Sequence, residues 1–411
     1  LAIFWWMNKP SEEELEQRKR QLDSIEQVEQ QQAREEEQAA EEKTVETRET
    51  PEAPTEEEKA RAKEASGILA SYVEGEKEYV TLENEFIRVK LSNQGGRVYS
   101  VEVKDYQTHD DQPLILFNGE ENRYGFTFTY NTRIFNTNEL YFDITDRTEN
   151  SVTFEIAGPE GEQLAFTYEL SEHEYMVDYQ ITAQNLGNKF ATPRNAIDLR
   201  WYQNMPTQEQ GRKFEQQYSG IYYKHYQDDV DNISGRGSSD DDIRTPLKWI
   251  AFKDQFFSSI MIADNQISSA RVETSVVEDE NSPFLRKNEA EMAIPFNFSD
   301  DTEASFSFYF GPNHYYTLKS HGELELHEIL PLGWGIFGWI NRFAIIPVFN
   351  FLSGFIGSYG IIILILTILI KIILFPLTYK SYMSQAKMRV LKPQIDEINE
   401  KIPKEKSMER Q

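Results

Sequence analysis

The stretch GIIILILTILIKIILFPLTYK, from Gly360 to Lys380, decides how the rest of this chain is arranged. Between Gly360 and Leu377 it carries one charged side chain, Lys371. About 18 residues at a helical rise of 1.5 Å span most of a hydrocarbon core of roughly 30 Å. A soluble core helix this apolar on every face would need a large protein around it. The stretch therefore predicts a transmembrane helix, which we place at 357–379.

Lys371 is the first candidate for a functional residue. An ammonium near the middle of a membrane helix costs a few kcal/mol, so such a lysine usually faces protein, water or a partner instead of lipid. Thr367 lies four residues earlier and adds a second polar group to the same helical face. The alternative is a lysine that reaches the headgroups, because Lys371 lies about seven residues, or roughly 10 Å, from the cytoplasmic end of the helix.

The composition excludes several classes of function. With 411 residues the chain has room for two or three domains, and 26 Phe and 21 Tyr supply core material. Its formal charge of −27 argues against nucleic-acid binding by the protein as a whole, because a phosphate backbone would be repelled. The absence of cysteine rules out disulfides, thiol catalysis and cysteine-based metal sites.

The chain opens with the apolar and aromatic run LAIFWWMN. We interpret residues 1–8 as the end of an N-terminal transmembrane helix, with Trp5 and Trp6 at the membrane interface. A disordered, sticky terminus is the alternative. Residues 9–75 are rich in Glu, Gln, Arg and Ala. They predict an acidic flexible linker, with a helix from Glu12 to Glu42 as an option.

A hydrophobic period of two begins near Tyr79 and predicts half-buried strands. Residues 87–91 and 101–103 form a hairpin around a turn at 93–96. The alternation returns at Phe126 and Phe128, at Val152, Phe154 and Ile156, at Leu164, Phe166 and Tyr168, at Val177, Tyr179 and Ile181, and at Phe306 and Phe308. Many short strands without helical periods between them favour an antiparallel β-sandwich at 76–322. An Asp-, Gly- and Ser-rich loop is expected to interrupt it from Asp228 to Asp242.

The sandwich sequence offers little catalytic chemistry. The run DDVDNISG does not fit the spacing of a calcium loop. The stretch SHGELELHE could bring His321, Glu323, Glu325 and His327 to one face of a strand, but it suits a helix equally well. No phosphate-cradling glycine loop, nucleophile elbow or zincin spacing is present in the sequence. We therefore expect no catalytic residue, no metal, no cofactor and no enzymatic activity.

Residues 323–356 join the sandwich to the membrane helix. The stretch from Pro331 to Gly360, which runs into the start of the membrane helix, is rich in tryptophan and phenylalanine. It has a single charged side chain, Arg342, and is interrupted by glycines and by Pro347. This mixture favours interfacial helices that lie in the headgroup layer. A re-entrant segment is the alternative.

Basic residues follow the membrane helix within about 15 residues, which by the positive-inside rule places this side in the cytoplasm. They are Lys380, Lys387, Arg389 and Lys392. The sandwich must then lie outside the cytoplasm, which in a bacterium means the periplasmic face of the inner membrane.

An apolar seam spaced three and four residues apart predicts the first helix of a coiled-coil hairpin at 380–411. Its members are Met388, Leu391, Ile395, Ile398 and Ile402. Such a seam needs a partner helix, supplied either in trans or by sequence beyond Gln411.

Two runs carry a family resemblance: K-x-x-x-x-P-L-T from Lys371 to Thr378, and A-K-M-R-x-L-x-P-x-I from Ala386 to Ile395. They resemble the first core helix and the cytoplasmic hairpin of the YidC membrane-protein insertases, relatives of the mitochondrial Oxa and chloroplast Alb insertases. LENEFIRVKLSNQGGRV, which begins at Leu82, is similar to the start of the large periplasmic domain of that family.

The resemblance implies a site that the residues alone did not define. Family members hold a positive charge in a hydrophilic groove of the inner leaflet, and Lys371 and Thr367 fall at groove positions. The periplasmic domain would be mutarotase-like in fold without a catalytic role. A family core has five membrane helices, of which this sequence holds one complete, so we expect a fragment that cannot form the groove by itself.

The expected function is that of an insertase and chaperone in the bacterial inner membrane, where the whole protein would be multi-pass. It would act on nascent membrane proteins at the lipid bilayer, alone or with the Sec translocon (SecYEG and SecDF), with the ribosome as a further partner. The alternative is a membrane-anchored carbohydrate-binding or mutarotase-like periplasmic protein, in which the sandwich acts and the helix only anchors it.

Overall fold

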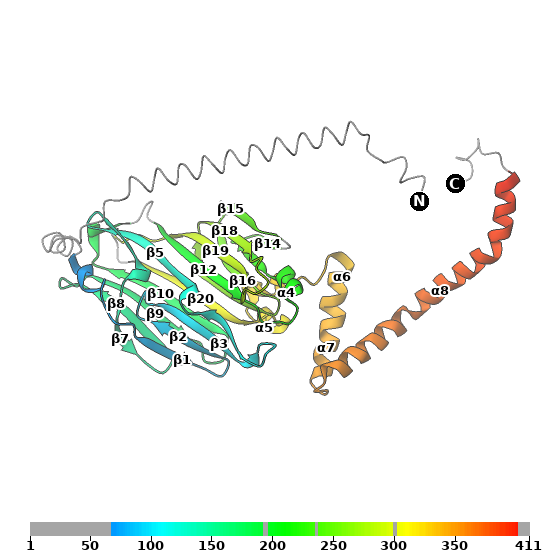
Figure 1. Cartoon of the computed structure of the whole chain (residues 1–411), viewed down its shortest axis with the longest axis horizontal. Helices are drawn as coiled ribbons and strands as arrows, with labels where there is room; N and C mark the ends of the chain where they lie inside the picture. Colours follow the sequence, from blue (N-terminus) through cyan, green and yellow to red (C-terminus); the bar gives the residue numbers. More distant parts are fainter. Residues whose placement is uncertain (1–66, 192–195, 235–236, 299–301, 402–411) are drawn as a thin grey trace.

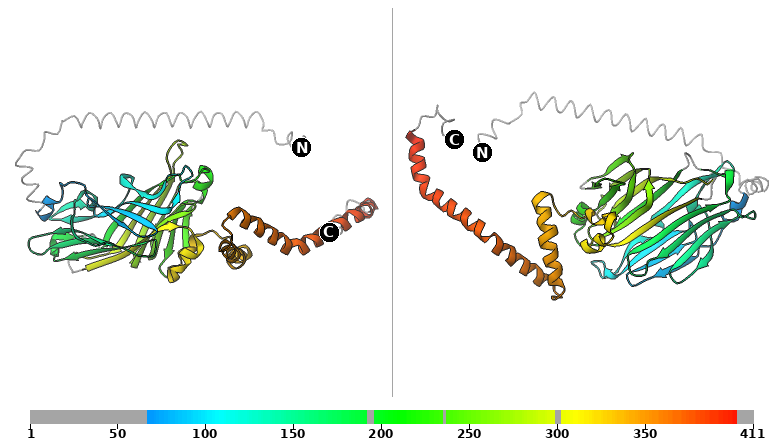
Figure 2. Two further views of the ribbon diagram at one scale, coloured as in Figure 1. Left: turned by 90° about the horizontal axis from the view of Figure 1, so that it is seen from below. Right: turned by 180° about the vertical axis from the view of Figure 1, so that it is seen from behind.

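A computed structural model describes residues 67–191, 196–234, 237–298 and 302–401 (Figure 1). The segment predicted to end a membrane helix at 1–8, and all but the end of the linker predicted at 9–75, lie outside these residues. A β-rich domain comes first along the described chain and is followed by apolar helices (Figures 1 and 2).

The described strands form three antiparallel sheets. The first has the order β1 (Tyr79–Glu83), β2 (Ile87–Ser92), β3 (Arg97–Gln107), β4 (Pro113–Asn118). The second has the order β14 (Val230–Ser234), β13 (Gly220–His225), β16 (Leu247–Lys253), β17 (Phe257–Ile267), β20 (Thr302–Pro312), β10 (Met176–Gln184), β9 (Gln163–Leu170), β8 (Ser151–Ala157), β7 (Asp143–Arg147). The third has the order β11 (Phe190–Ala191), β5 (Asn122–Tyr130), β12 (Ala196–Pro206), β19 (Phe284–Pro295), β18 (Ser269–Val276), β15 (Ser239–Ile243), with β6 (Arg133–Asn136) beside β5.

Aromatic side chains fill the space between the sheets. Trp201 of β12 stacks on Phe252 of β16 with ring centroids 3.9 Å apart. Tyr124 of β5 lies 5.0 Å from Phe308 of β20, also measured between ring centroids. These contacts join the third sheet to the second across a buried core. The antiparallel sandwich predicted from the alternating pattern is therefore confirmed.

A buried chain of hydrogen bonds also ties the three sheets together. The Tyr168 hydroxyl donates to the carbonyl oxygen of Gly96 at 2.7 Å, and the Val98 N–H donates to the Tyr124 hydroxyl at 2.9 Å. The two hydroxyl oxygens lie 2.8 Å apart. Because the Tyr168 hydroxyl hydrogen is donated to the Gly96 carbonyl oxygen, the Tyr124 hydroxyl must donate to the Tyr168 hydroxyl oxygen. Every polar atom of this chain thus has a partner, as burial requires.

The predicted strands appear where the hydrophobic pattern placed them. The hairpin is β2 and β3, with Ile87 opposite Val103 and Val89 opposite Val101. Its turn contains Gly95 at φ +84°, a left-handed conformation that glycine adopts without a Cβ clash. The other predicted alternations lie in β5, β8, β9, β10 and β20.

The loop predicted from Asp228 to Asp242 is wrong for most of its length, because two edge strands lie there. β14 pairs with β13, and β15 pairs with β18. Ile233 and Ile243 are buried, and the Tyr223 hydroxyl donates to Asp241 Oδ2 at 2.7 Å. Edge strands often carry charged residues, which discourage pairing with other chains, so their composition resembles that of a loop.

The packed domain extends beyond the predicted limits of 76 and 322. At its start, the turn η1 (Gly67–Ser71) buries Leu69 in the core. At its end, α5 (Tyr315–Ser320), η6 (Gly322–Leu324) and η7 (Leu326–Ile329) bury Leu326 and Ile329 against Trp249. The Trp249 indole N–H donates to the carbonyl oxygen of Leu324 at 2.8 Å. Packing contacts that are distant in sequence therefore set both limits.

Further short elements complete the domain: η2 (Gly119–Glu121), η3 (Thr137–Glu139), η4 (Gly187–Lys189) and α4 (Arg212–Tyr218). Beyond it, α6 (Gly335–Ile340), the π-helical turn η8 (Asn341–Ile345) and α7 (Ile346–Ser353) run on as one helical stretch. The long helix α8 (Tyr359–Lys401) follows without a break at Pro376 or Pro393. By length and apolar composition, 335–353 and 359–397 could each cross a membrane. The interfacial placement of 323–356 therefore stays a prediction.

Candidate functional site

Lys371 and Thr367 both lie in the apolar part of α8 and are exposed on the described chain. Of the residues one turn away from Lys371, Ile368, Leu374 and Phe375 are apolar and Thr367 is polar. The Thr367 hydroxyl donates to the carbonyl oxygen of its own helix at Ile363, at 2.7 Å. This bond satisfies the hydroxyl inside the helix. Of the two polar residues, Lys371 is therefore the one whose charge can interact with a partner.

More polar residues continue this face toward the C-terminus of α8. Thr378, Ser381 and Gln385 lie within an arc of about 80° that includes Lys371, at about 100° per residue. The Thr378 hydroxyl donates to the carbonyl oxygen of Leu374 at 2.8 Å. The sequence reasoning missed these three residues, although their helical spacing was the signal for them. We call the set the polar stripe: Thr367, Lys371, Thr378, Ser381 and Gln385.

The predicted cytoplasmic basic flank lies on the same helix. Lys380, Lys387, Arg389 and Lys392 are all exposed. Lys380 comes nine residues after Lys371. At about 100° per residue this spacing amounts to two and a half turns, so Lys380 lies on the opposite face of α8. The cytoplasmic location of the flank stays a prediction.

The predicted seam is apolar and exposed where its side chains are described. Met388 is 58% exposed, Leu391 44% and Ile395 39%. Ile398 belongs to α8, but its side chain lies outside the described residues, as does Ile402 altogether. Pairing of this seam with a second helix stays a prediction.

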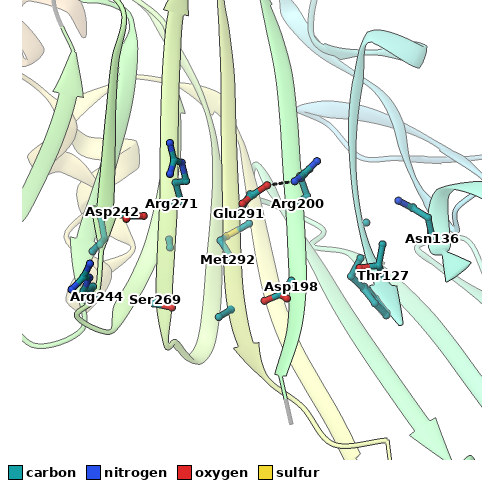
Figure 3. Close-up of a pocket in the computed structure, with 15 residues that line it drawn as sticks. Thr127, Asn136, Asp198, Arg200, Asp242, Arg244, Ser269, Arg271, Glu291 and Met292 are labelled. Carbon is teal, nitrogen blue, oxygen red and sulfur yellow. Dashed lines mark hydrogen bonds and ion pairs between the residues drawn. The ribbon is translucent and has the colours of Figure 1, made fainter. Parts of the chain in front are cut away.

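A second candidate site is a groove of about 530 Å³ on the outer face of the third sheet (Figure 3). Small residues such as Gly125, Ser269 and Ala293 line it and leave it hollow. Gly125 has to be glycine because η3 crosses it, and a Cβ there would lie 2.6 Å from the Thr137 hydroxyl. The strand register places residues of opposite charge in one row across four strands: Arg200, Glu291, Arg271 and Asp242.

Two of the charges in this groove, Arg200 and Glu291, are paired with each other. Arg200 forms an ion pair with Glu291 (Figure 3) and lies 3.2 Å from Glu289 through its Nε. The lining residues include no histidine, and their aromatic ring, Phe126, is 2% exposed. Acid–base chemistry on a sugar would need a carboxyl or imidazole free to move a proton. Asp198 and Asp242 are carboxyls of this lining without an ion pair among the described residues, but the groove offers no imidazole and no exposed ring for a sugar to stack on.

The histidine and glutamate run at 321–327 forms 3₁₀ turns, so of the two options the strand is wrong. Lys224 lies 2.7 Å from Glu325 and its hydrogen bond lowers the pKa of that carboxyl. Burial lowers the pKa of His321 and of His327. Across the described residues, no group of three or more His, Asp or Glu side chains could hold a metal ion.

A pair of buried acids beneath α4 was also missed. Glu215 is fully buried and Asp254 nearly so. Glu215 Oε1 accepts the Gln208 N–H at 2.9 Å, and Asp254 Oδ1 accepts the Ser219 hydroxyl at 2.6 Å. Burial first, and the neighbouring Asp254 second, raise the pKa of Glu215 to about 8. No sequence signal marks this pair, because its members come from separate elements.

Comparisons with known proteins match both parts of the chain. The family model of the YidC periplasmic domain matches residues 79–345, and that of the 60Kd inner membrane protein matches 351–411. Membrane protein insertase YidC of Parabacteroides distasonis is 39% identical over 100% of this chain and 66% of its own length. That of Bacteroides fragilis is 37% identical over 98% of this chain and 64% of its own length. The chain thus spans about two thirds of the length of these relatives.

Solved structures similar to the sandwich include sugar-handling proteins. A galactose mutarotase related enzyme from Lactobacillus acidophilus is 11% identical, with a TM-score of 0.37 over 57% of this chain and 97% of its own. A putative aldose 1-epimerase from Escherichia coli K12 is 10% identical, with a TM-score of 0.36 over 58% of this chain and 100% of its own.

An antiparallel sandwich that continues into helices apolar enough to cross a bilayer indicates a membrane protein with a large folded domain. Within that class, this chain belongs to the YidC family of membrane protein insertases.

Proposed function

We propose that this chain supplies the periplasmic domain and the first groove-lining helix of an insertase that helps nascent membrane proteins pass from water into lipid. The observation that carries the proposal is Lys371, a single cation in the apolar part of α8 and a member of the polar stripe. Membership of the YidC family supports it. The proposed activity belongs to the whole protein, whose relatives are longer than the region matched here.

The proposed mechanism is electrostatic. A cation in a partly hydrated groove attracts acidic residues of a segment that is about to cross the membrane. At 4 Å and an effective dielectric constant of 20, two unit charges attract by about 4 kcal/mol, against about 1 kcal/mol in water. The attraction offsets part of the cost of moving a polar flank toward lipid, and the step itself needs no nucleotide.

The orientation of the proposed insertase follows from the basic flank. Lys380, Lys387, Arg389 and Lys392 would stay in the cytoplasm under the positive-inside rule. The sandwich would then lie in the periplasm. The exposed seam from Met388 to Ile395 would pack on a second helix, and the ribosome and the Sec translocon are the partners we propose for the whole protein.

We propose no enzymatic role for the sandwich. The carbohydrate-binding or mutarotase-like alternative would use the groove of Figure 3, whose Arg200 and Glu291 neutralise each other. A sugar ligand that protected Arg200 from modification would support that alternative instead.

Charge variants of Lys371 test the proposed function in cells depleted of their own insertase. Lys371→Arg should insert a substrate with an acidic translocated tail as the parent does. Lys371→Ala and Lys371→Glu should lower the rate of insertion of this substrate about tenfold or more, since about 1.4 kcal/mol of activation free energy corresponds to a tenfold change in rate. Lys371→Arg is also the matched control, because it changes the same side chain and keeps its charge. Full insertion by a stably produced Lys371→Glu protein would refute the electrostatic mechanism.

A further inference from the structure

An exposed apolar surface lies at one end of the sandwich and is not part of the groove. Phe214 and Tyr218 of α4 are 56% and 36% exposed, and their ring centroids lie 4.8 Å apart. Phe256, in the turn between β16 and β17, is 50% exposed. Together with Leu330 and Leu332 they line a hollow of about 380 Å³. We call this surface the aromatic rim: Phe214, Tyr218, Phe256, Leu330 and Leu332.

The rim is held in place by hydrogen bonds beneath it. Arg212, at the start of α4, donates to the carbonyl oxygens of Ser282 at 2.8 Å and Phe284 at 2.6 Å. The Phe256 carbonyl oxygen accepts the N–H of Asn313 at 2.7 Å. These bonds fix α4 and the turn, so their aromatic rings point outward from a rigid base.

The rim lies where the chain leaves the domain for the apolar helices. Leu332 lines the hollow, and α6 begins at Gly335. Three residues extend at most about 11 Å, so the rim cannot be far from the start of α6. Figures 1 and 2 show α4 and α5 at the end of the sandwich nearest to α6. The connecting residue Trp334 is itself 84% exposed.

The charge of the rim suits a membrane surface. The whole chain has 69 Asp and Glu residues, yet the described residues that line the hollow include no acid. An acidic surface would be repelled by anionic headgroups, whereas an acid-free one is not. Aromatic side chains also favour the layer between water and hydrocarbon.

From these observations we infer that the aromatic rim rests in the headgroup layer of the outer leaflet, with phospholipid as its occupant. The inference rests on the proposed orientation, in which the sandwich is periplasmic. It gives the rim a positioning role, because contact at this end would hold the sandwich upright over the helices that follow.

The cysteine-free sequence allows single spin labels to test this contact. Full-length chains with Phe214→Cys or Phe256→Cys would be labelled and placed one per nanodisc of phosphatidylethanolamine and phosphatidylglycerol. Ile134→Cys, at a position 78% exposed on β6, is the matched control. The rim labels should be more accessible to oxygen than to a water-soluble nickel complex, and the control label should show the reverse.

Rim labels as open to the nickel complex as the control label would overturn the inference. So would labels shielded from both reagents, since that pattern means contact with protein. A label at Tyr218→Cys should lose its lipid contact when Phe214→Ser and Phe256→Ser are added, which excludes insertion driven by the label. The pattern should persist in a Lys371→Glu chain, so failure of insertion and failure of docking can be told apart.

Discussion

Lys371 and Thr367 share one face of α8 but differ in what their polar atoms can do. The Thr367 hydroxyl is bonded to the Ile363 carbonyl oxygen, whereas an ammonium cannot be satisfied by a single carbonyl of its own helix. Helical spacing alone placed Lys371 and Thr367 on one face. The same spacing also places Thr378 there, although it was not predicted. The raised pKa of Glu215 could not be predicted, because it depends on burial and on Asp254, which is distant in sequence.

Glu215 makes the stability of the sandwich depend on pH. The unfolded chain releases this proton near pH 4.5, whereas the folded domain keeps it to about pH 8. Between these values the folded state binds more protons, so its stability should fall as pH rises, by up to about 1.4 kcal/mol per pH unit. Lys253, whose pKa burial lowers to about 8, titrates mainly above this range.

Urea unfolding followed by tryptophan fluorescence at pH 5.5 and 7.5 measures this slope. Glu215→Gln keeps a neutral side chain of the same shape and should reduce the slope, although burial also raises the pKa of Asp254, which can keep part of it. Glu280→Gln, a change at an acid whose side chain is 74% exposed, should leave it unchanged. An equal slope in the parent and in Glu215→Gln would show that another group carries the proton.

At the scale of elements, strands with a clear local pattern could be predicted, whereas elements that depend on packing against distant residues could not. Strands with clean alternation, such as β8 and β10, were predictable because one face of each is buried. The edge strands β14 and β15 were not, because their acidic residues face water. The turns η6 and η7 belong to the sandwich only through burial against Trp249, which no local pattern reveals.

Leu326 of η7 should therefore stabilise the sandwich, although it lies in the segment predicted to be interfacial. It is fully buried with Trp249 and Leu318. Leu326→Ala should reduce the free energy of unfolding by about 2–5 kcal/mol. Ile336→Ala, at a position 68% exposed in α6, should change it by less than about 0.5 kcal/mol. Equal effects of the two variants in urea unfolding would place Leu326 outside the packed domain.

At the scale of the whole molecule, the proposed orientation rests on an uneven distribution of charge along the chain. The acidic chain carries its sandwich on one side of the apolar helices and its basic flank on the other. The sequence predicted this order of parts, and the structure adds the aromatic rim at the junction. Exposure of Phe214 and Phe256 depends on how distant elements meet, so the sequence did not indicate it.

Single cysteines give the orientation directly, because the parent chain has none. Ile134→Cys on the sandwich should react with an impermeant maleimide in intact spheroplasts. Gln385→Cys, beyond the membrane part of α8, should react only after the cells are permeabilised. The opposite pattern would overturn the orientation that the basic flank predicts.

Site-specific photo-crosslinking from α8 to a nascent substrate tests the central claim most directly. A photo-reactive residue would replace Thr367 or Thr378 on the polar stripe, or Ile373, which points about 160° away from Lys371 and is 65% exposed. Ribosome-bound chains of a membrane protein with an acidic tail should crosslink several-fold more from the two threonine positions than from Ile373. Equal crosslinking from both faces, or crosslinking from Ile373 alone, would contradict the claim that the Lys371 face of α8 receives the substrate.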